Sequence, residues 1–146
     1  MAAISIIARL SADKPPVGTL CKAGKYLAFR VARQDFAMNI AVVRSILPVH
    51  QMTSIENQRW VTGFASVGGR DFLIVDLRAK LEIAQGPKGR EPFIIVVETG
   101  GKLVGFIADR ISKVLDVRAK DFRNGAIRLQ GRVRMLLEPA QIIVGD

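Results

Sequence analysis

Residues 63–78, GFASVGGRDFLIVDLR, contain two short strand-like runs on either side of a Gly-Gly pair. The runs 64–67 and 72–75 are rich in apolar residues of the kind found in strands. Gly68 and Gly69 suit a tight turn between them, because glycine adopts positive φ without steric cost. The stretch predicts a β-hairpin. Asp76 follows the second run directly and is expected to cap the next turn through its side chain.

Two more hairpins are predicted on the same grounds. Residues 25–31 alternate with a period of two, residues 33–35 supply a polar turn, and residues 36–40 resume an extended pattern. Residues 93–107 contain the most strand-like run of the chain and a second Gly-Gly turn. Residues 41–47 fit either a short helix or a strand, and Pro48 ends that segment in both cases. The chain is therefore predicted to be mainly β.

The two halves of the chain resemble each other. When Tyr26 is placed on Phe93, 67 positions later, strand, turn and strand coincide, and after one extra residue Ile46 falls on Val114. Further along the chain, residues 74–76 align with residues 136–138. This repetition predicts a duplication that forms two similar barrels. The turn-rich stretch 86–90 is the expected linker between them.

The composition favours a binding protein over an enzyme. Hydrophobic residues make up 49% of the 146 residues, which is enough for a core without disulfides or metal. Cys21 and His50 are the only residues of their types and fall short of a zinc ligand set. Neither Gly-Gly pair belongs to a phosphate-binding loop, and no nucleophile elbow is present. We expect no catalytic residues, no metal and no cofactor.

Location and charge give broader limits. Residues 1–24 look like a loosely attached leader, and no apolar run approaches the ~20 residues that a membrane-spanning helix needs. We expect a cytoplasmic protein without membrane insertion. The net charge is +9, and both halves contribute to it. This excess fits an acidic protein partner, nucleic acid or solubility alone.

Three arginines and the aromatic residues bear on the nucleic-acid alternative. Arg128, Arg132 and Arg134 alternate along a strand-like segment and are expected to lie on a solvated cationic face. The aromatic residues, among them Phe64 and Phe72, are expected in the core. Because single-stranded nucleic acid is usually held by aromatic residues stacked on its bases, this arrangement weakens that alternative.

Four segments in this order resemble the CheW-like domain. They are residues 26–40, 63–78, 104–111 and 131–138, and the resemblance covers nearly everything from Lys25 to the C-terminus. At four positions the sequence departs from the usual family pattern: Ser45 replaces a glutamate, Ser66 an asparagine, Gly68 an arginine and Leu73 a proline. The change at position 68 removes a guanidinium suited to binding a carboxylate.

The resemblance implies an all-β fold of two five-stranded SH3-like barrels, packed as a pseudo-duplicate about an apolar seam. The leader would be residues 1–24 and the CheW-like domain residues 25–146, with intertwined halves of roughly 25–85 and 93–146. The implied function is that of a bacterial chemotaxis adaptor without enzymatic activity. Its partners would be the cytoplasmic tip of a methyl-accepting chemoreceptor and the regulatory domain of a CheA-type histidine kinase.

The same resemblance implies tentative contact residues. Val43 and Ile46 would lie near a receptor-facing groove, and Gly63, Gly69 and Arg78 near surfaces that contact the kinase or the receptor. For the apolar residues, packing in the core is an equally good interpretation. The alternative function is that of a small basic barrel that binds nucleic acid.

Overall fold

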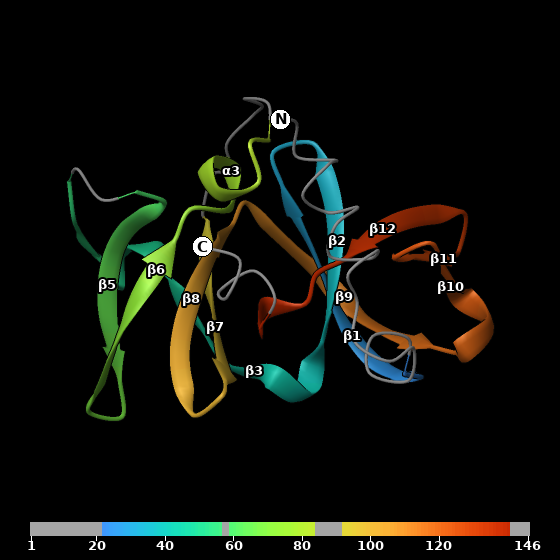
Figure 1. Ribbon diagram of the computed structural model, residues 1–146, viewed down its shortest axis with the longest axis horizontal. Coiled ribbons are helices and arrows are strands. Elements are labelled where there is room, and N and C mark those ends of the chain that lie inside the picture. Colours follow the sequence, from blue (N-terminus) through green and yellow to red (C-terminus); the bar gives the residue numbers. More distant parts are fainter. Residues whose placement is uncertain (1–21, 57–58, 84–91, 141–146) are drawn as a thin grey trace.

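Strands dominate the computed structural model, which describes residues 22–56, 59–83 and 92–140 (Figure 1). The first half contains β1 (Gly24–Val31), β2 (Gln34–Asn39), η1 (Ile40–Val42), β3 (Val43–Pro48), η2 (Val49–Gln51), β4 (Thr53–Ser54), β5 (Val61–Val67), β6 (Arg70–Val75) and α3 (Leu77–Lys80). The second half contains β7 (Phe93–Thr99), β8 (Lys102–Ala108), β9 (Arg110–Val117), η3 (Ala119–Asp121), β10 (Phe122–Arg123), β11 (Ala126–Leu129) and β12 (Arg132–Leu136). The predicted mainly β fold is confirmed.

The strands form two sheets that exchange hairpins between the halves of the chain. Sheet A has the order β10-β11-β12-β2-β1-β9, and sheet B has the order β3-β7-β8-β6-β5-β4. The first hairpin, β1–β2, thus lies among strands of the second half, and the hairpin β7–β8 lies among strands of the first half (Figure 1). Two parallel pairs, β2–β12 and β6–β8, join the exchanged hairpins to the remaining strands.

The strand pairing shows how many residues separate matching positions of the internal repeat. Phe29 pairs with Phe36 in β1–β2, and Val97 pairs with Val104 in β7–β8, so matched positions lie 68 residues apart. The spacing of 67 expected from the sequence is one residue too short for these strands. Because successive residues of a strand face opposite sides, an error of one residue exchanges the two faces of the sheet.

A second spacing applies to the later hairpins. Ala65 pairs with Phe72 in β5–β6, and Ile127 pairs with Arg134 in β11–β12, which places matched positions 62 residues apart. The spacing is shorter because the second half has fewer residues before its last hairpin. The pseudo-duplicate architecture is therefore confirmed, and Arg134 occupies the place of an aromatic residue.

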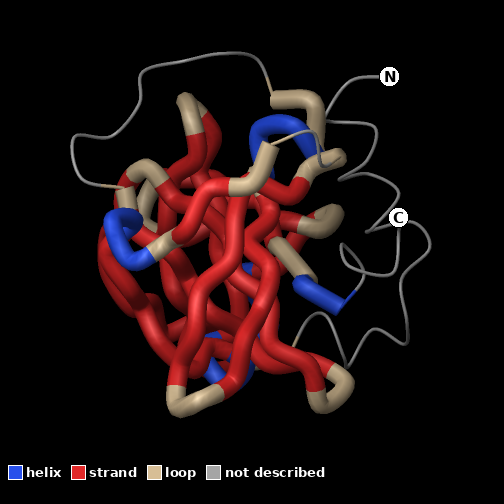
Figure 2. The backbone as a smooth tube through the Cα atoms, turned by 90° about the vertical axis from the view of Figure 1, so that its left-hand side faces the viewer, coloured by secondary structure: helices blue, strands red, loops and turns tan. Residues whose placement is uncertain are grey.

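Three apolar clusters hold the molecule together. One lies between the sheets and is called the seam; it includes Phe29, Phe36, Met38, Val97 and Phe106. Each sheet also curls around a cluster of its own, and we call the resulting units barrel A and barrel B. The barrel A core contains Tyr26, Ala28, Ala37, Leu115, Val117, Ile127 and Leu136. The barrel B core contains Ala65, Phe72, Ile74, Ile94 and Val96. Figure 2 shows the short helical segments at the periphery of the strands.

Several local predictions are confirmed by the structure, and the one for Phe64 is wrong. The three predicted hairpins form, and Asp76 caps α3 by accepting a hydrogen bond from the Arg78 backbone at 3.0 Å. Phe64, expected in the core, is 40% exposed because it lies on the outward side of β5. The expected leader falls mostly on residues 1–21, and the linker 86–90 falls within 84–91; both ranges lie outside the described residues.

The three alternating arginines do not share one solvated face. Arg128 pairs with Val133 and is exposed on one side of the β11–β12 hairpin. Arg132 and Arg134 lie on the other side, and Arg134 is only 3% exposed. The alternation correctly predicted a strand, but the side of that strand that faces the core is set by Leu136, two residues beyond Arg134.

Candidate protein-binding surfaces

Val43 and Ile46 lie on the seam side of β3. Val43 pairs with Val97 and Ile46 with Ile95, and both partners belong to the seam cluster. Val43 packs against that cluster, whereas Ile46 is 41% exposed. An exposed apolar side chain on the outermost strand of a sheet is a feature of surfaces that bind other proteins.

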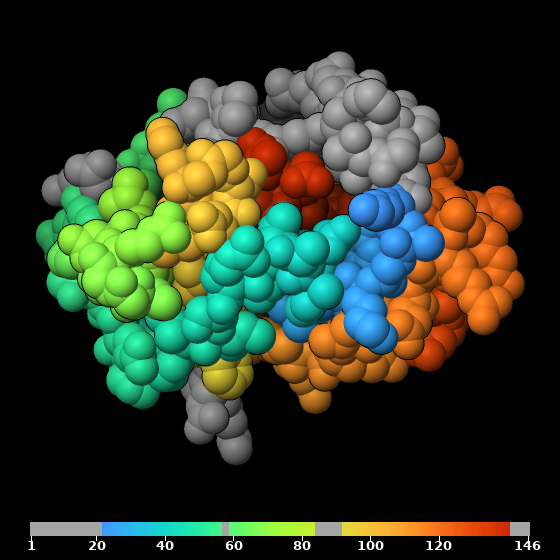
Figure 3. Space-filling model, turned by 90° about the horizontal axis from the view of Figure 1, so that it is seen from below, coloured from blue at the N-terminus to red at the C-terminus, as the bar shows by residue number. Residues whose placement is uncertain are grey.

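The pseudo-symmetry produces a similar position in sheet A. Val114 of β9 pairs with Leu27, a seam residue, and is 50% exposed. In the described residues, β3 and β9 each end a sheet, so each leaves one apolar side chain beside the seam. Figure 3 shows the η1–β3 segment (teal) across the middle of the lower face, between barrel B elements (green and yellow) and β1 with β9–β10 (blue and orange).

A second exposed apolar pair lies on the outward side of barrel B. Phe64 of β5 pairs with Leu73 of β6, and the two are 40% and 51% exposed. Sequence reasoning missed this pair because apolar residues occupy both phases of the alternation in these strands. One residue could have indicated this surface from the sequence. Leu73 stands where the resemblance leads us to expect a proline, so this hairpin carries an unusual apolar side chain.

Gly63 is buried where β4 and β5 approach closely. A Cβ atom at this position would lie 2.5 Å from both the Met52 Cγ and the Thr53 carbonyl oxygen. Contacts this short force the backbone apart, so glycine is required here for packing. Gly63 therefore shapes barrel B and presents no side chain to a partner.

Gly69 lies at the tip of the β5–β6 hairpin. Gly68 and Gly69 have φ of 57° and 78°, and a Cβ at either position would meet nothing within 4 Å. The turn conformation therefore requires glycine, whereas the surrounding space does not. The exposed tip is open to a partner through its backbone.

Arg78 forms a buried ion pair between the barrels. Its guanidinium donates to the Asp109 carboxylate at 2.6 Å, and the two side chains are 12% and 11% exposed. The same carboxylate oxygen accepts a hydrogen bond from the Ala32 backbone at 2.6 Å. Ala32 has φ of 55°, so this contact holds a conformation that alanine seldom adopts. Arg78 thus links α3 to the β1–β2 turn.

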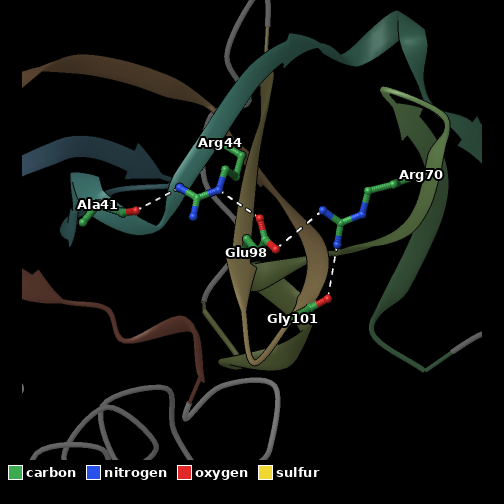
Figure 4. A network of polar contacts seen from close by, with 5 residues as sticks. All are labelled: Ala41, Arg44, Arg70, Glu98 and Gly101. Atoms are coloured by element: carbon green, nitrogen blue, oxygen red, sulfur yellow. Dashed lines mark hydrogen bonds and ion pairs between the residues drawn. The ribbon is translucent and has the colours of Figure 1, made fainter.

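A second polar network connects three strands of barrel B (Figure 4). Arg44 of β3 and Arg70 of β6 both contact the Glu98 carboxylate of β7, at 2.9 Å and 3.5 Å. The guanidiniums also donate to the backbone carbonyls of Ala41 and Gly101. The hydrogen bond from Arg44 is the main reason why the pKa of Glu98 lies below its ordinary value of 4.5. One carboxylate between two arginines leaves this surface cationic.

The five candidate residues therefore do not form one site. Val43 and Ile46 lie together on β3, and Gly69 lies at a hairpin tip of barrel B. Gly63 and Arg78 are enclosed by other parts of the chain. The geometry leaves two apolar surfaces available: the seam edge around Ile46, and the Phe64–Leu73 pair.

This pairing of two interlocked barrels around a seam agrees with a known family. A family model described as the CheW-like domain matches residues 25–145. The chain belongs to the CheW-like domain family. Proteins of this family act as scaffolds in chemotaxis signalling. The features that matter for such a role are surfaces that contact other proteins.

Individual CheW relatives extend the comparison. A chemotaxis protein CheW of Rhizobium meliloti (strain 1021) is 30% identical over 131 residues, which are 77% of this chain and 82% of the relative. A chemotaxis protein CheW of Klebsiella aerogenes is 27% identical over 100 residues, 68% of this chain and 60% of the relative. The crystal structure of the scaffolding protein TtCheW from Thermoanaerobacter tengcongensis matches with a TM-score of 0.73 at 18% identity, over 82% of this chain and 87% of that one.

The described part of the CheW-like domain contains neither a candidate membrane-spanning helix nor a candidate metal site. Within residues 22–56, 59–83 and 92–140, no helix is long and apolar enough to cross a membrane. In the same residues, no three His, Cys, Asp or Glu side chains gather closely enough to hold a metal ion.

Proposed function

We propose that this chain is a non-enzymatic cytoplasmic adaptor that couples a chemoreceptor to a CheA-type histidine kinase. The receptor would contribute its cytoplasmic tip and the kinase its regulatory domain. Membership of a scaffold family supports the proposal, and the observation that carries it is the pair of separate apolar surfaces. A coupling protein must bind two partners at once, and two distinct surfaces on one rigid body allow this.

The seam edge is assigned to the receptor. Val43 anchors this surface against the seam, and Ile46 and Val114 supply exposed apolar area. A receptor tip is built of helices, and an apolar helix face fits against such a groove edge. Because Ile46 and Val114 are only 41% and 50% exposed, burial of the rest of one such side chain contributes about 1 kcal/mol.

The outer surface of barrel B is assigned to the kinase regulatory domain. Here Phe64 and Leu73 form a cross-strand apolar pair, and the Gly69 turn lies at the end of the same hairpin. Gly63 supports this surface from within the fold, where it lets β4 approach β5 closely. The contact is mainly apolar, so we expect it to persist at physiological salt.

Three substitutions test both assignments by isothermal titration calorimetry against a purified kinase regulatory domain and a receptor tip. Ile46→Ser is expected to weaken receptor binding by about tenfold or more, and Leu73→Ser to weaken kinase binding similarly. Val133→Ser is the matched control. Val133 is 52% exposed, close to the 51% of Leu73, but it lies on β12 of barrel A. Its affinities should match the wild type.

The result that would overturn the proposal is a protein that binds neither partner in any form. Salt-resistant, sequence-selective binding of an oligonucleotide in the same assay would support the nucleic-acid alternative instead. In barrel A, Tyr26 is buried and packs edge to face on Phe122 with ring centroids 5.7 Å apart, so the Tyr26 ring is not available to stack on a base.

A further inference from the structure

Arg134 occupies a core position in barrel A. It pairs with Ile127, which is fully buried, and it is itself 3% exposed. The matching pair in barrel B is Ala65 and Phe72, and Phe72 is 4% exposed in that core. A guanidinium therefore lies where the related barrel has an aromatic ring.

This guanidinium is incompletely paired. Its Nη1 atom is fully enclosed and has no hydrogen-bond partner among the described residues. Burial, followed by the charge of Arg132, lowers the pKa of Arg134, and Asp35 acts in the opposite direction. The Asp35 carboxylate is already bound to Arg30 at 3.0 Å. A buried cation without a full set of acceptors is costly, and arginine does not escape the cost by losing its proton.

The charged side chains around Arg134 lie at one end of barrel A. Strand alternation places them on the side of their strands that faces the core, beyond its last apolar residues. The Lys113 ammonium of β9 donates to the Gln130 side chain at 2.9 Å, which links β9 to the β11–β12 turn. We call this end of the barrel the mouth; it is lined by Arg30, Asp35, Lys113, Gln130, Arg132 and Arg134.

The mouth has an excess of positive charge. Four of its six residues are cations, and one is a carboxylate. The neighbouring sequence is also basic: five further Lys and Arg residues between positions 110 and 128 are all exposed, against two Asp residues in that segment. These cations are Arg110, Arg118, Lys120, Arg123 and Arg128. An anion that approaches this side of the molecule is attracted toward the mouth.

We propose that the mouth of barrel A binds an Asp or Glu side chain from an acidic segment of a partner protein, with the Arg134 guanidinium as its principal donor. The carboxylate completes the hydrogen bonding of Nη1 and offsets the buried charge. Lys113 and Arg132 are exposed at this end of the barrel, and a change of their rotamers is the step by which the carboxylate would reach the enclosed Nη1. A carboxylate lies at the free end of its side chain, whereas a phosphodiester is linked to its chain on both sides. The proposal rests on the proposed function only in that a partner protein supplies the carboxylate.

The first test uses the full chain and acetate as the simplest carboxylate. Sodium acetate is added at constant ionic strength, and sodium chloride is added in a parallel control. The Nε–Hε resonances of the arginines are followed by NMR in both titrations. Comparison with Arg134→Leu assigns the Arg134 resonance. We expect a saturable shift of that resonance with acetate and none with chloride. Equal responses to the two anions would overturn the proposal.

The second test measures fluorescence anisotropy with a labelled peptide of alternating Glu and Gly, and with a Gln-containing version as control. Arg134→Leu is expected to weaken Glu-peptide binding by about tenfold or more, because a hydrogen-bonded charge is lost. Arg128→Leu removes the same charge from the opposite side of the same hairpin and should change the affinity less than about twofold. Arg134→Lys keeps the charge but not the fork of donors, and should fall between them.

The outcomes separate this site from the coupling function. Equal losses in Arg134→Leu and Arg128→Leu would mean that the charge acts diffusely and that the mouth is no site. Arg134-dependent binding of an oligothymidylate in place of the Glu peptide would overturn the assignment to a protein partner. If kinase and receptor binding are absent but acetate still shifts the Arg134 resonance, the coupling proposal fails and the mouth stands. If Arg134→Leu does not fold, Arg134→Lys takes its place. That variant also lacks the Arg134 resonance, so it assigns the signal for the acetate titration, and its loss of Glu-peptide affinity is compared with that of Arg128→Leu.

Discussion

Glu98 and Glu138 are two glutamates whose environments shift their pKa values in opposite directions. Glu98 lies between two arginines, and the hydrogen bond from Arg44 is the largest cause that lowers its pKa. Burial raises the pKa of Glu138, and a hydrogen bond from the Ala140 backbone reduces that shift. The two residues therefore affect stability on opposite sides of the ordinary value of 4.5.

We predict opposite pH dependences for the two glutamine variants. The lowered pKa of Glu98 gives stability that is present above the ordinary value and is lost as pH falls through the folded value. The raised pKa of Glu138 gives stability that is present below the ordinary value and is lost as pH rises through the folded value. Glu98→Gln should therefore flatten the loss of stability in acid, and Glu138→Gln should increase stability near neutral pH. Urea unfolding between about pH 3 and pH 8 measures both; curves parallel to the wild type would contradict the assignment.

At the scale of elements, caps and ion pairs fix how the strands leave the sheets. Asp76 accepts a hydrogen bond from the backbone two residues ahead, and Glu138 does the same at its matched position. The Arg78–Asp109 pair then holds α3 against the β1–β2 turn. These contacts connect elements that the hairpins alone leave independent.

The buried ion pair of Arg78 should be worth far more than an exposed one. Arg78→Met is predicted to destabilise the protein by about 3–5 kcal/mol, because it leaves the Asp109 charge buried. Lys25→Met is a matched control, since the Lys25–Asp116 pair has the same 2.6 Å separation but is exposed. That control should cost less than about 1 kcal/mol. Chemical denaturation measures both values, and similar losses in the two variants would contradict the role given to Arg78.

The elements were predictable from the sequence, but their sidedness was only partly so. Alternation located the hairpins, since a period of two is a local property. Alternation did not reveal which side of a strand faces the core when apolar residues occupy both sides, as Phe64 and Ala65 do in β5. Arg134 shows the converse: its charge indicated a solvated face, and the packing of the next residues overrode it. The family resemblance proposed Val43 and Ile46 on β3 as contact residues, and that role stays a prediction, whereas the positions of Phe64 and Arg134 required coordinates.

At the scale of the whole molecule, the decisive feature is the exchange of hairpins between the sheets. Barrel A needs β1–β2 from the first half, and barrel B needs β7–β8 from the second. Local patterns carry no information about such distant pairing, so the sequence predicted two barrels without establishing which strands each would contain. The boundary near residues 86–92 stays a prediction, and each barrel contains strands from both sides of it.

We predict that neither half folds alone. A fragment of residues 1–86 lacks β7–β8 and β9–β12, so both of its potential barrels are incomplete and its seam residues are exposed. Each separate fragment should lack a cooperative thermal transition by circular dichroism. A mixture of fragments 1–86 and 87–146 should regain the strand signal and the transition. Cooperative unfolding of the first fragment by itself would contradict this reading of the topology.

The same exchange sets an order of events during protein synthesis. While the ribosome is still making the first half, β1–β2 has no neighbours in its sheet and must wait. Barrel B has all its strands once residue 108 has emerged, whereas barrel A is complete only after residue 136. Barrel B therefore closes first, and the earliest hairpin of the chain is among the last to be covered. A nascent chain of this kind leaves the apolar strands β1–β2 without their sheet neighbours for most of the synthesis of this domain, and exposed strands of that kind are prone to aggregation.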